Sequence, residues 1–228
     1  MTKRRKTALF LFLFLCIGAI ALTYCGKTGD HGYQGIDVSH HQGEITWEQV
    51  GADKNIQFVY IKATEGTSFK DPKYRYNTKQ AQKQGIKTGA YHYFRTTSNP
   101  QRQAEHFIKT IKSANHELIP VVDVEECEHR NRKKLQDSLK IFCNTIEQQC
   151  GIKPVIYSTN QFYLYFLYPQ FNEYKLWIAN YYLPFIILPN KKYTIWQFSE
   201  KGKLKGIETP VDLDRLHPKF TVDDLLLK

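Results

Sequence analysis

Cysteine is scarce in this sequence and methionine almost absent, with five Cys and one Met among 228 residues. Cys16 and Cys25 fall within the first 26 residues, and Cys127, Cys143 and Cys150 lie in the rest of the chain. Three is an odd number, so at most one internal disulfide can form there, which excludes a disulfide-stapled scaffold. No Cys-x-x-Cys or His/Cys spacing suggests zinc, and we expect neither a metal nor a cofactor.

Internal repeats and low-complexity segments are also lacking, as are a Gly-rich phosphate loop and a Gly-x-Ser-x-Gly nucleophile elbow. The Lys and Arg residues are scattered rather than gathered on one helix, so nucleic acid is not an expected partner. What remains is an ordinary globular composition in a chain whose length is normal for a single α/β barrel.

The first 26 residues differ from the rest of the chain. Four consecutive basic residues, Lys3 to Lys6, precede an uncharged stretch, residues 7–26, that contains a Leu- and Phe-rich run, which is typical of an export signal. We expect residues 1–26 to be a signal, lipoprotein or membrane-anchor segment, 27–34 a short linker and 35–228 one barrel domain. Lipidation at Cys25 after cleavage, an uncleaved anchor, and cleavage with release all stay open. Each places the barrel outside the cytoplasm, tethered to the membrane or free.

Short apolar runs alternate with helix-like polar stretches after this segment. The expected strands are Gly35–Ser39, Gln57–Ala63, Lys87–Phe94, Ile119–Glu125, Pro154–Ser158, Lys175–Asn180, Tyr193–Phe198 and Thr209–Leu213. The expected helices are Pro72–Gln84, Pro100–Ala114, Arg130–Cys150 and Gln161–Leu167. Strands that alternate with helices predict a parallel sheet, and about eight strands in this length predict a closed α/β barrel. The last three strands are separated by short or Pro-rich segments, so we predict an irregular TIM-like (β/α) barrel that is regular in its first five units.

Polar and aromatic residues lie near the ends of these strands, where the chemistry of a βα barrel takes place. They are Asp37, Lys62, Glu65, Tyr91, His92, Tyr93, Asp123, Glu125, Tyr157, Trp177, Asn180, Trp196, Gln197 and Asp212. Because nearly every strand contributes such a residue, their convergence indicates a site more strongly than any one of them does.

The Asp123-Val124-Glu125 triplet is the sharpest local signal. Residues i and i+2 of a strand share a face, with side chains about 6–7 Å apart. Two carboxylates that close repel, so one keeps its proton to higher pH and can act as a general acid beside an ionised partner. An acid at a strand end can also cap a helix or pair with Lys, and for an isolated triplet that explanation would be preferred. Asp37 on the adjoining first strand brings a third carboxylate, which favours a catalytic role in glycoside cleavage.

Other strand-end residues have structural explanations of comparable weight. His40 and His41 are adjacent and face apart, which favours a hydrogen-bonded loop over a metal site. Lys62 and Glu65 fit a structural ion pair as well as they fit a substrate contact. The aromatic residues can stack on sugar rings or fill the barrel, and a Trp at a strand end slightly favours the cleft.

Several blocks of this sequence occur in a characteristic order between Tyr33 and Leu216. They are Gly35–Gly43, Phe58–Gly66, Gly89–Phe94, Asp123–Glu125, Ile156–Ser158, Leu176–Ala179, Ile195–Phe198 and Val211–Leu213. Their order and spacing together resemble the glycoside hydrolase family 25 lysozymes of the Chalaropsis type.

The resemblance implies an N-acetylmuramidase that cuts β-1,4 bonds in the glycan strands of peptidoglycan. It implies a modified (β/α) barrel with five βα units plus three further strands. Glu125 would be the general acid, and Asp123 would orient or stabilise a charged intermediate formed by the 2-acetamido group of the substrate. Asp37 and Asp212 would hold that arrangement in place, and direct hydrolysis with inversion stays open.

The resemblance also implies where the substrate lies and where this chain departs from the family. Asp214 and Arg215 stand where an Asn and a polar residue are more usual, which puts fine substrate contacts in doubt. The residues expected to contact the substrate are Asp212, Tyr91, Tyr93, Tyr157, Trp177, Trp196, Glu65 and Lys62.

Two other functions fit the same residues. A chitinase-like glycosidase acting on N-acetylglucosamine polymers would use the same Asp-x-Glu pair, which suits any 2-acetamido sugar. A non-catalytic glycan-binding barrel would be expected to have lost its acid, yet Asp123 and Glu125 are both present. A monomer is expected in each case.

Overall fold

The computed structural model describes residues 32–182, 186, 188 and 193–227. The expected export or anchor segment, residues 1–26, lies outside the described residues, as does most of the expected linker. Within the described ranges, every helix is too short or too polar to span a membrane.

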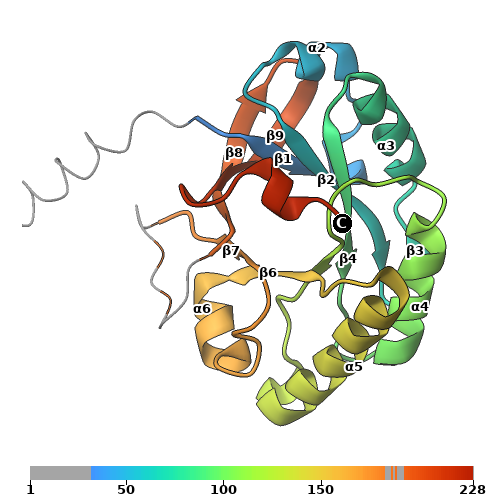
Figure 1. The fold of residues 1–228 in the computed structure, drawn as a ribbon, viewed down its shortest axis with the longest axis vertical. Coiled ribbons are helices and arrows are strands. Elements are labelled where there is room, and N and C mark those ends of the chain that lie inside the picture. Colours follow the sequence, from blue (N-terminus) through green and yellow to red (C-terminus); the bar gives the residue numbers. More distant parts are fainter. Residues whose placement is uncertain (1–31, 183–185, 187, 189–192, 228) are drawn as a thin grey trace, which may run out of the picture. The chain divides into compact units, whose positions relative to one another are not determined.

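Eight strands close into a barrel (Figure 1). They are β1 (Gly35–Val38), β2 (Phe58–Glu65), β4 (Lys87–Tyr93), β5 (Val121–Asp123), β6 (Val155–Thr159), β7 (Leu176–Ala179), β8 (Ile195–Leu204) and β9 (Ile207–Leu216). The sheet order is β1-β9-β8-β7-β6-β5-β4-β2, and pairing of β1 with β2 completes the ring. A short strand, β3 (Phe69–Lys70), pairs with β2 outside the ring. The prediction of a closed, irregular barrel is confirmed.

Helices connect the parallel strands from β1 to β7. They are α2 (Trp47–Ala52), α3 (Tyr74–Lys83), α4 (Pro100–Ile111), α5 (Arg132–Cys150) and α6 (Asn160–Phe162), the last continuing into a π-helical turn at Tyr163–Leu167. Short 3-10 turns lie at His40–Gln42, Glu128–Arg130 and Val222–Leu225. Figure 1 shows α3, α4 and α5 following one another around one side of the barrel. Helix α2 was not predicted, because six residues are too few for a clear helical period.

The two long helices begin and end where their capping residues require. The side chain of Asn99 accepts a hydrogen bond from the Arg102 backbone N–H at 2.9 Å, ahead of Pro100 at the first helical position of α4. Asn131 caps α5 in the same way, and α5 ends at Gly151, whose φ of 73° suits glycine. These signals explain why α4 and α5 were predicted within a few residues.

The last strand departs from the parallel order predicted from the alternation of strands and helices. Only two residues, Lys205 and Gly206, join β8 to β9, and Gly206 has a φ of 94°. A link this short can join only antiparallel strands, so β9 runs antiparallel to both β8 and β1. The barrel is therefore closed by a hairpin rather than by a sixth βα unit.

Two hydrophobic clusters surround and fill the barrel. Outward residues of the strands pack against the helices, as Val59 and Ile61 do with Phe107 and Phe142. The inner cluster consists of Phe58, Tyr60, Leu118, Ile119, Val121, Val155, Tyr157, Trp177, Ala179, Ile195, Leu216 and Leu225. Leu225 belongs to the Val222–Leu225 turn, whose carbonyl at Leu225 accepts from the Ile119 N–H at 2.8 Å. The turn therefore closes the barrel at the end where the parallel strands begin.

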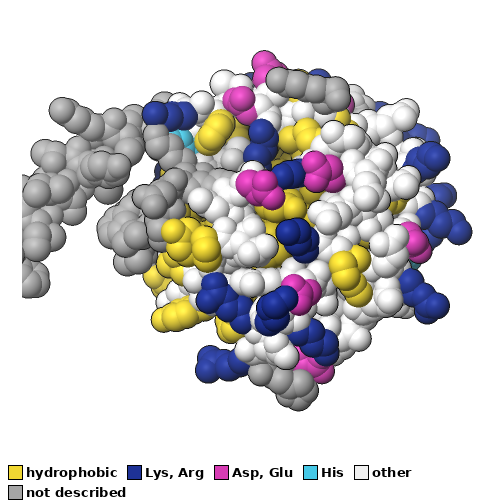
Figure 2. Space-filling view, turned by 60° about the horizontal axis from the view of Figure 1, so that its bottom comes forward, with side chains coloured by type: hydrophobic (Ala, Val, Ile, Leu, Met, Phe, Trp, Pro, Cys, Tyr) yellow, Lys and Arg dark blue, Asp and Glu magenta, His cyan; other side chains and the backbone are white. Residues whose placement is uncertain are grey.

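The outer surface carries charges of both signs. On the face in Figure 2, Lys and Arg side chains are dispersed around the molecule and interleaved with Asp and Glu. The three cysteines of the described residues, Cys127, Cys143 and Cys150, are free thiols.

Close packing inside the barrel gives a stability prediction for Gly35. A Cβ atom at this position would lie 2.2 Å from two ring carbons of Phe58, so something must shift. We expect Gly35→Ala to lower the free energy of unfolding by about 1–3 kcal/mol, measured by denaturant unfolding. In a Phe58→Leu background, which removes the ring, the added cost of Gly35→Ala should be smaller. An equal cost in both backgrounds would contradict this explanation.

Candidate active site

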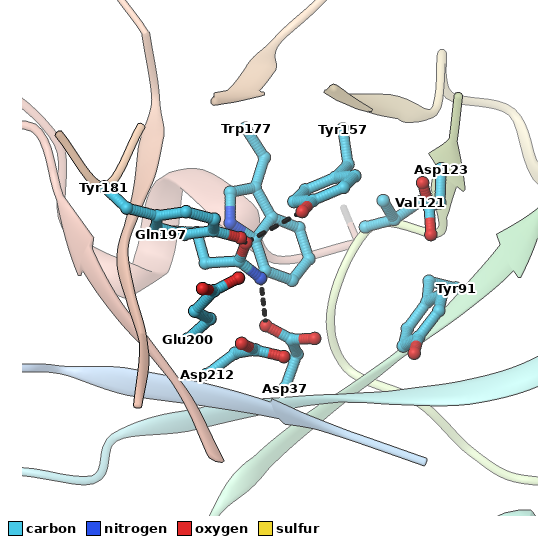
Figure 3. Close-up of a pocket in the computed structure, with 10 residues that line it drawn as sticks. All are labelled: Asp37, Tyr91, Val121, Asp123, Tyr157, Trp177, Tyr181, Gln197, Glu200 and Asp212. Atoms are coloured by element: carbon cyan, nitrogen blue, oxygen red, sulfur yellow. Dashed lines mark hydrogen bonds between the residues drawn. The ribbon is translucent and has the colours of Figure 1, made fainter. Parts of the chain in front are cut away.

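A cavity of about 230 Å³ opens at the end of the barrel where the parallel strands finish (Figure 3). It is lined by Asp37, Tyr91, Val121, Asp123, Tyr157, Trp177, Tyr181, Gln197, Glu200 and Asp212. Six of these ten residues were predicted to belong to the site. Four of the ten are carboxylic acids and none is basic. The cavity is somewhat smaller than the roughly 300–1,000 Å³ of pockets for drug-sized ligands, so it can enclose only part of a larger ligand.

Strand register explains why these side chains meet. Paired residues on neighbouring strands share a face, and side chains alternate along each strand. Asp37 of β1 pairs with Asp212 of β9, so both carboxyl groups point into the barrel mouth. Across the cavity, Asp123 of β5 pairs with Tyr157 of β6, which pairs in turn with Trp177 of β7.

Gln197 of β8 connects the two sides of the cavity, as Figure 3 shows. Its Nε2 donates to Asp37 Oδ2 at 2.7 Å, and its Oε1 accepts from the Tyr157 hydroxyl at 2.7 Å. The Tyr181 hydroxyl also donates to this Oε1. The amide orientation is therefore determined by its partners on both sides. From the sequence Gln197 was only one polar residue at a strand end, and nothing there distinguished it as a connecting group.

The acids of β1 and β9 hold their protons more tightly than usual. Burial raises the pKa of Asp37 well above its ordinary range, and the neighbouring Asp212 and Asp214 raise it further. Burial also raises the pKa of Asp212 to about 6, with Glu200 and Glu125 adding to the effect. This side of the mouth is consequently able to keep carboxyl groups neutral near pH 6.

Asp123 and Glu125 stand on the opposite side of the mouth. Strand β5 ends at Asp123, and the buried Val124 continues the extended chain by donating its N–H to the Tyr157 carbonyl at 3.0 Å. Burial, followed by repulsion from Glu125, raises the pKa of Asp123 well above its ordinary range, while Lys62 lowers it. Asp123 Oδ1 has no hydrogen-bond partner within the described residues. That oxygen is itself buried, although Asp123 lines the cavity.

Glu125 lies at the rim rather than among the residues that line the cavity, and its side chain is exposed. The protein around its carboxyl group still displaces enough water to raise its pKa. The neighbouring Tyr157 hydroxyl lowers the pKa, as does Lys62. A protonated carboxyl group at an open rim can reach a bond in a chain that crosses the cleft, and can exchange its proton with water.

Lys62, Glu65 and Tyr93 belong to a cluster at the rim beside Asp123. Lys62 Nζ lies 2.7 Å from Glu65 Oε2 and 5.1 Å from the centroid of the Tyr93 ring. Arg95 pairs with Glu65 at 2.6 Å, and its guanidinium also lies over the Tyr93 ring, 4.7 Å from the centroid. The cation of Lys62 thus lies next to the acids, although none of these three predicted residues lines the cavity itself.

Trp196 is also away from the cavity. Because Gln197 points inward, the adjacent Trp196 points outward, where its Nε1 donates to the Asn180 carbonyl at 2.9 Å. The Arg215 guanidinium stacks 4.1 Å from the centroid of the Trp196 ring. In the same way His92 points outward between Tyr91 and Tyr93, and burial lowers its pKa to about 3, so it is a neutral core residue.

Metal-binding arrangements of three or more His, Cys, Asp or Glu side chains are absent from the part of the chain that the structure describes. His40 instead contacts Asp71, with 2.7 Å between Nδ1 and Oδ2. The chemistry that this site offers is that of carboxyl groups with displaced pKa values.

Comparison with known proteins is consistent with this chemistry. The model of the family described as glycosyl hydrolases family 25 matches residues 36–207. The uncharacterised protein YegX of Escherichia coli K12 is 35% identical over 184 residues, which cover 79% of this chain and 68% of that protein. A solved family 25 glycosyl hydrolase from Bacillus anthracis aligns with a TM-score of 0.74 at 29% identity, covering 83% of this chain and 94% of that one. A solved lysozyme from Streptomyces coelicolor aligns with a TM-score of 0.75 at 27% identity, covering 87% and 96% respectively.

The position of Gln197 gives a prediction about the pH dependence of stability. In Gln197→Glu a new carboxyl group faces Asp37 and keeps its proton when folded, whereas an unfolded Glu ionises near pH 4.3. The folded state then binds more protons than the unfolded state, so the free energy of unfolding should fall as pH rises above about 4.

Gln197→Met is the matched control, because it removes the hydrogen bonds without adding a titratable group. It should cost about 1–3 kcal/mol, and its pH dependence should differ from that of the wild type only through the lost hydrogen bond that lowers the pKa of Asp37. Denaturant unfolding across pH 4–8 measures both variants. If Gln197→Glu showed the same pH dependence as Gln197→Met, the new Glu would not keep its proton in the folded state. The prediction that the neighbouring acids raise its pKa would then be wrong.

Proposed function

The chain belongs to family 25 of the glycosyl hydrolases, and from that premise we propose that it is a lysozyme. In this proposal it hydrolyses the β-1,4 bond between N-acetylmuramic acid and N-acetylglucosamine in peptidoglycan. The observation that carries the proposal is one cavity lined by Asp37, Asp123 and Asp212, with Glu125 two residues after Asp123 at its rim. It works outside the cytoplasm as a monomer, with residues 1–26 as export signal or membrane tether.

Glu125 acts as the general acid in this proposal. Its raised pKa keeps the proton on the carboxyl group at a pH where an ordinary Glu has lost it. Its position at the open rim suits a glycan strand that lies across the cleft. As the glycosidic C–O bond breaks, Glu125 gives its proton to the departing oxygen, and the sugar at the other side of the bond acquires positive charge at C1.

Asp123 supports the charged sugar. The carbonyl oxygen of the 2-acetamido group attacks C1, and the resulting ring carries its positive charge partly on the acetamido nitrogen. The Asp123 carboxylate, which lines the cavity, accepts a hydrogen bond from that N–H. Water then adds to C1, the C1–O bond to the acetamido group breaks, and a proton from the water returns to Glu125. Direct attack of water on C1 with inversion would use the same acid, and the anomeric form of the first product distinguishes the two routes.

The walls of the cavity suit a sugar ring. Tyr91 and Tyr181 are partly exposed and flank the opening, whereas Trp177 and Tyr157 are buried and form its floor. Aromatic faces pack well against the C–H faces of sugars, and the acids between them can bind hydroxyl and amide groups. Asp37 and Asp212 hold this arrangement together through Gln197 and the pairing of β1 with β9.

Digestion of purified peptidoglycan by the full-length protein tests the proposal. Wild type should release fragments with muramic acid at the new reducing ends, identified by mass spectrometry. Glu125→Gln should lower kcat by about 10²–10⁴-fold, because the amide has no proton to give. Glu105→Gln is the matched control: Glu105 accepts from Gln101 on the exposed side of α4, so this variant should keep most of the activity.

Other products would contradict the proposal in distinct ways. Glucosamine at the reducing ends would move the cut to the other glycosidic bond. Cleavage of chitin oligomers but not peptidoglycan would favour the chitinase-like alternative. A folded wild-type protein that binds glycan without cutting it would favour the binding barrel.

The cation of Lys62 gives a prediction about the pH profile. Lys62 lowers the pKa of both Asp123 and Glu125, so Lys62→Met should raise both. Glu125 would then keep its proton up to a higher pH, and Asp123 would lose its proton at a higher pH. Both limbs of the kcat/KM profile should therefore move to higher pH. Lys87→Met is the control, since Lys87 pairs with Glu117 at the other end of β4. Equal midpoints in the two variants would show that Lys62 does not act on the acids.

A further inference from the structure

Asp214 is a buried acid that the proposed reaction does not use. It lies on β9 two residues after Asp212, so both side chains point into the barrel, and its side chain is completely inaccessible to solvent. Its Oδ1 accepts a hydrogen bond from Trp177 Nε1 at 2.8 Å. Its Oδ2 is buried without a hydrogen-bond donor anywhere in the described residues. An unpartnered oxygen on a buried carboxylate is costly, and so requires an explanation.

Asp37 is the acidic neighbour of Asp214 on the adjoining strand. In the pairing of β1 with β9, Asp37 lies opposite Asp212 and Gly35 lies opposite Asp214. Asp37 and Asp214 are therefore diagonal neighbours on the inner face, with no side chain on Gly35 beside them. A hydrogen bond between the two carboxyl groups is among the causes that lower the pKa of Asp214, as expected for diagonal neighbours. Asp37 has one donor of its own, Gln197 Nε2, on Oδ2.

Two ionised carboxylates in this position would have no hydrogen between them. Neither could donate, Asp214 Oδ2 would stay unpartnered, and two negative charges would repel each other in a region without water. One added proton removes all three difficulties, because it forms an O–H···O hydrogen bond between the groups and cancels one charge.

We propose that Asp37 and Asp214 share one proton at the base of the cleft, and that Asp214 is thereby a positioning residue for Asp37. The proton belongs to the pair rather than to one residue, since two groups so close titrate together. Trp177 and Gln197 each supply one further N–H, so the pair has the donors needed for a single remaining negative charge.

The surroundings of the pair favour retention of that proton. The titratable groups that face it are Asp212 on β9, Asp123 on β5, Tyr60 on β2, Tyr91 on β4, Tyr157 on β6 and Tyr181 after β7. All of these are acids, and within the described residues no salt bridge joins Asp37 or Asp214 to a cation. Lys62 acts on Asp123 instead. Burial raises the pKa of both members of the pair well above the usual range.

The shared proton determines what Asp37 can do in the cleft. One carboxyl oxygen of Asp37 accepts from Gln197, and the carboxyl group also shares the proton with Asp214. Asp37 is therefore held in one orientation and carries less than a full negative charge. This role for Asp37 rests on the proposed function, whereas the shared proton does not.

The pH dependence of folding tests the shared proton without any use of activity. Full-length wild type, D214N, D37N and the double variant are unfolded reversibly in denaturant between pH 4 and 8. An unfolded Asp ionises near pH 3.9, but the folded pair keeps its proton to higher pH. Rising pH therefore favours unfolding, until the folded pair also releases its proton. Relative to D214N, the folded-to-unfolded equilibrium constant of the wild type should fall about tenfold per pH unit in that interval.

The double variant separates a shared proton from two independent ones. If one proton is shared, D37N, D214N and the double variant should all lose the same single linked proton. Parallel curves for wild type and D214N would overturn the proposal. So would a double variant that loses twice as much pH dependence as either single variant, because each acid would then hold its own proton.

A spectroscopic measurement keeps the test decisive if D214N does not refold. The infrared difference spectrum of wild type minus D37N at neutral pH should contain one carbonyl band of a buried protonated carboxyl group, because the bands of Asp123, Glu125 and Asp212 are common to both proteins. That difference band should disappear in a one-proton titration at higher pH. A wild-type minus D37N difference spectrum without such a band would overturn the proposal.

The positioning role has its own readout. In D214N the amide can donate directly to an ionised Asp37, whereas D214L offers it no partner. The kcat/KM of D214N on peptidoglycan should exceed that of D214L by about tenfold, the effect of one unsatisfied buried group. Equal values in folded variants would overturn the positioning role. An inactive wild type would instead overturn the proposed function and leave the folding result unaffected.

Discussion

Closing eight strands into a ring leaves the inward side chains of all strands one narrow space to share. Here the lower part of that space is filled by rings such as Phe58, Tyr60 and Trp177, and water is excluded. The carboxyl groups at the mouth lie against this apolar cluster, so water cannot solvate their charges on that side. Every feature of the site follows from that constraint: displaced pKa values, the bridging amide of Gln197 and the dependence on a few N–H donors.

The distribution of charge follows the same division between inside and outside. The whole chain has a formal net charge of +10, yet the cavity is lined by four acids and no base. A basic exterior attracts polyanions such as bacterial wall polymers over long distances, whereas the acidic interior controls protons at short range. Lys62 is the cation that acts on Asp123 and Glu125 at the rim, and its own partner Glu65 partly offsets it.

Strand ends could be predicted from the sequence because polar residues there interrupt apolar runs. Asp37 and Asp123 were identified in this way, and the structure places both in the cavity. Trp196 and Gln197 were assigned to the same strand end, but alternation allows only one of two adjacent residues to face inward. The sequence contains no signal for which of the two it is, because the inward set depends on the register with β7 and β9.

Site residues that lie beyond the ends of the expected strands could not be predicted from the sequence for a related reason. Glu200 lines the cavity because β8 continues to Leu204, well past its predicted end at Phe198, within a hairpin whose length the alternation pattern does not encode. The antiparallel course of β9 was likewise missed, although the two-residue link at Lys205-Gly206 is the physical cause and is visible in hindsight. A strand can be predicted from its own residues, whereas its pairing partners are determined by how the whole ring closes.

The hairpin that closes the ring has a consequence for when the site comes into being. Asp37 lies on the first strand to be synthesised, and Asp212 and Asp214 lie on the last. Contacts between segments so far apart in the chain form late, because the whole intervening chain must be ordered around them. A growing chain therefore contains Asp37, Asp123 and Glu125 before it contains β9, the strand that completes the ring. The connectivity of the barrel by itself delays the proposed activity until synthesis has passed the final hairpin.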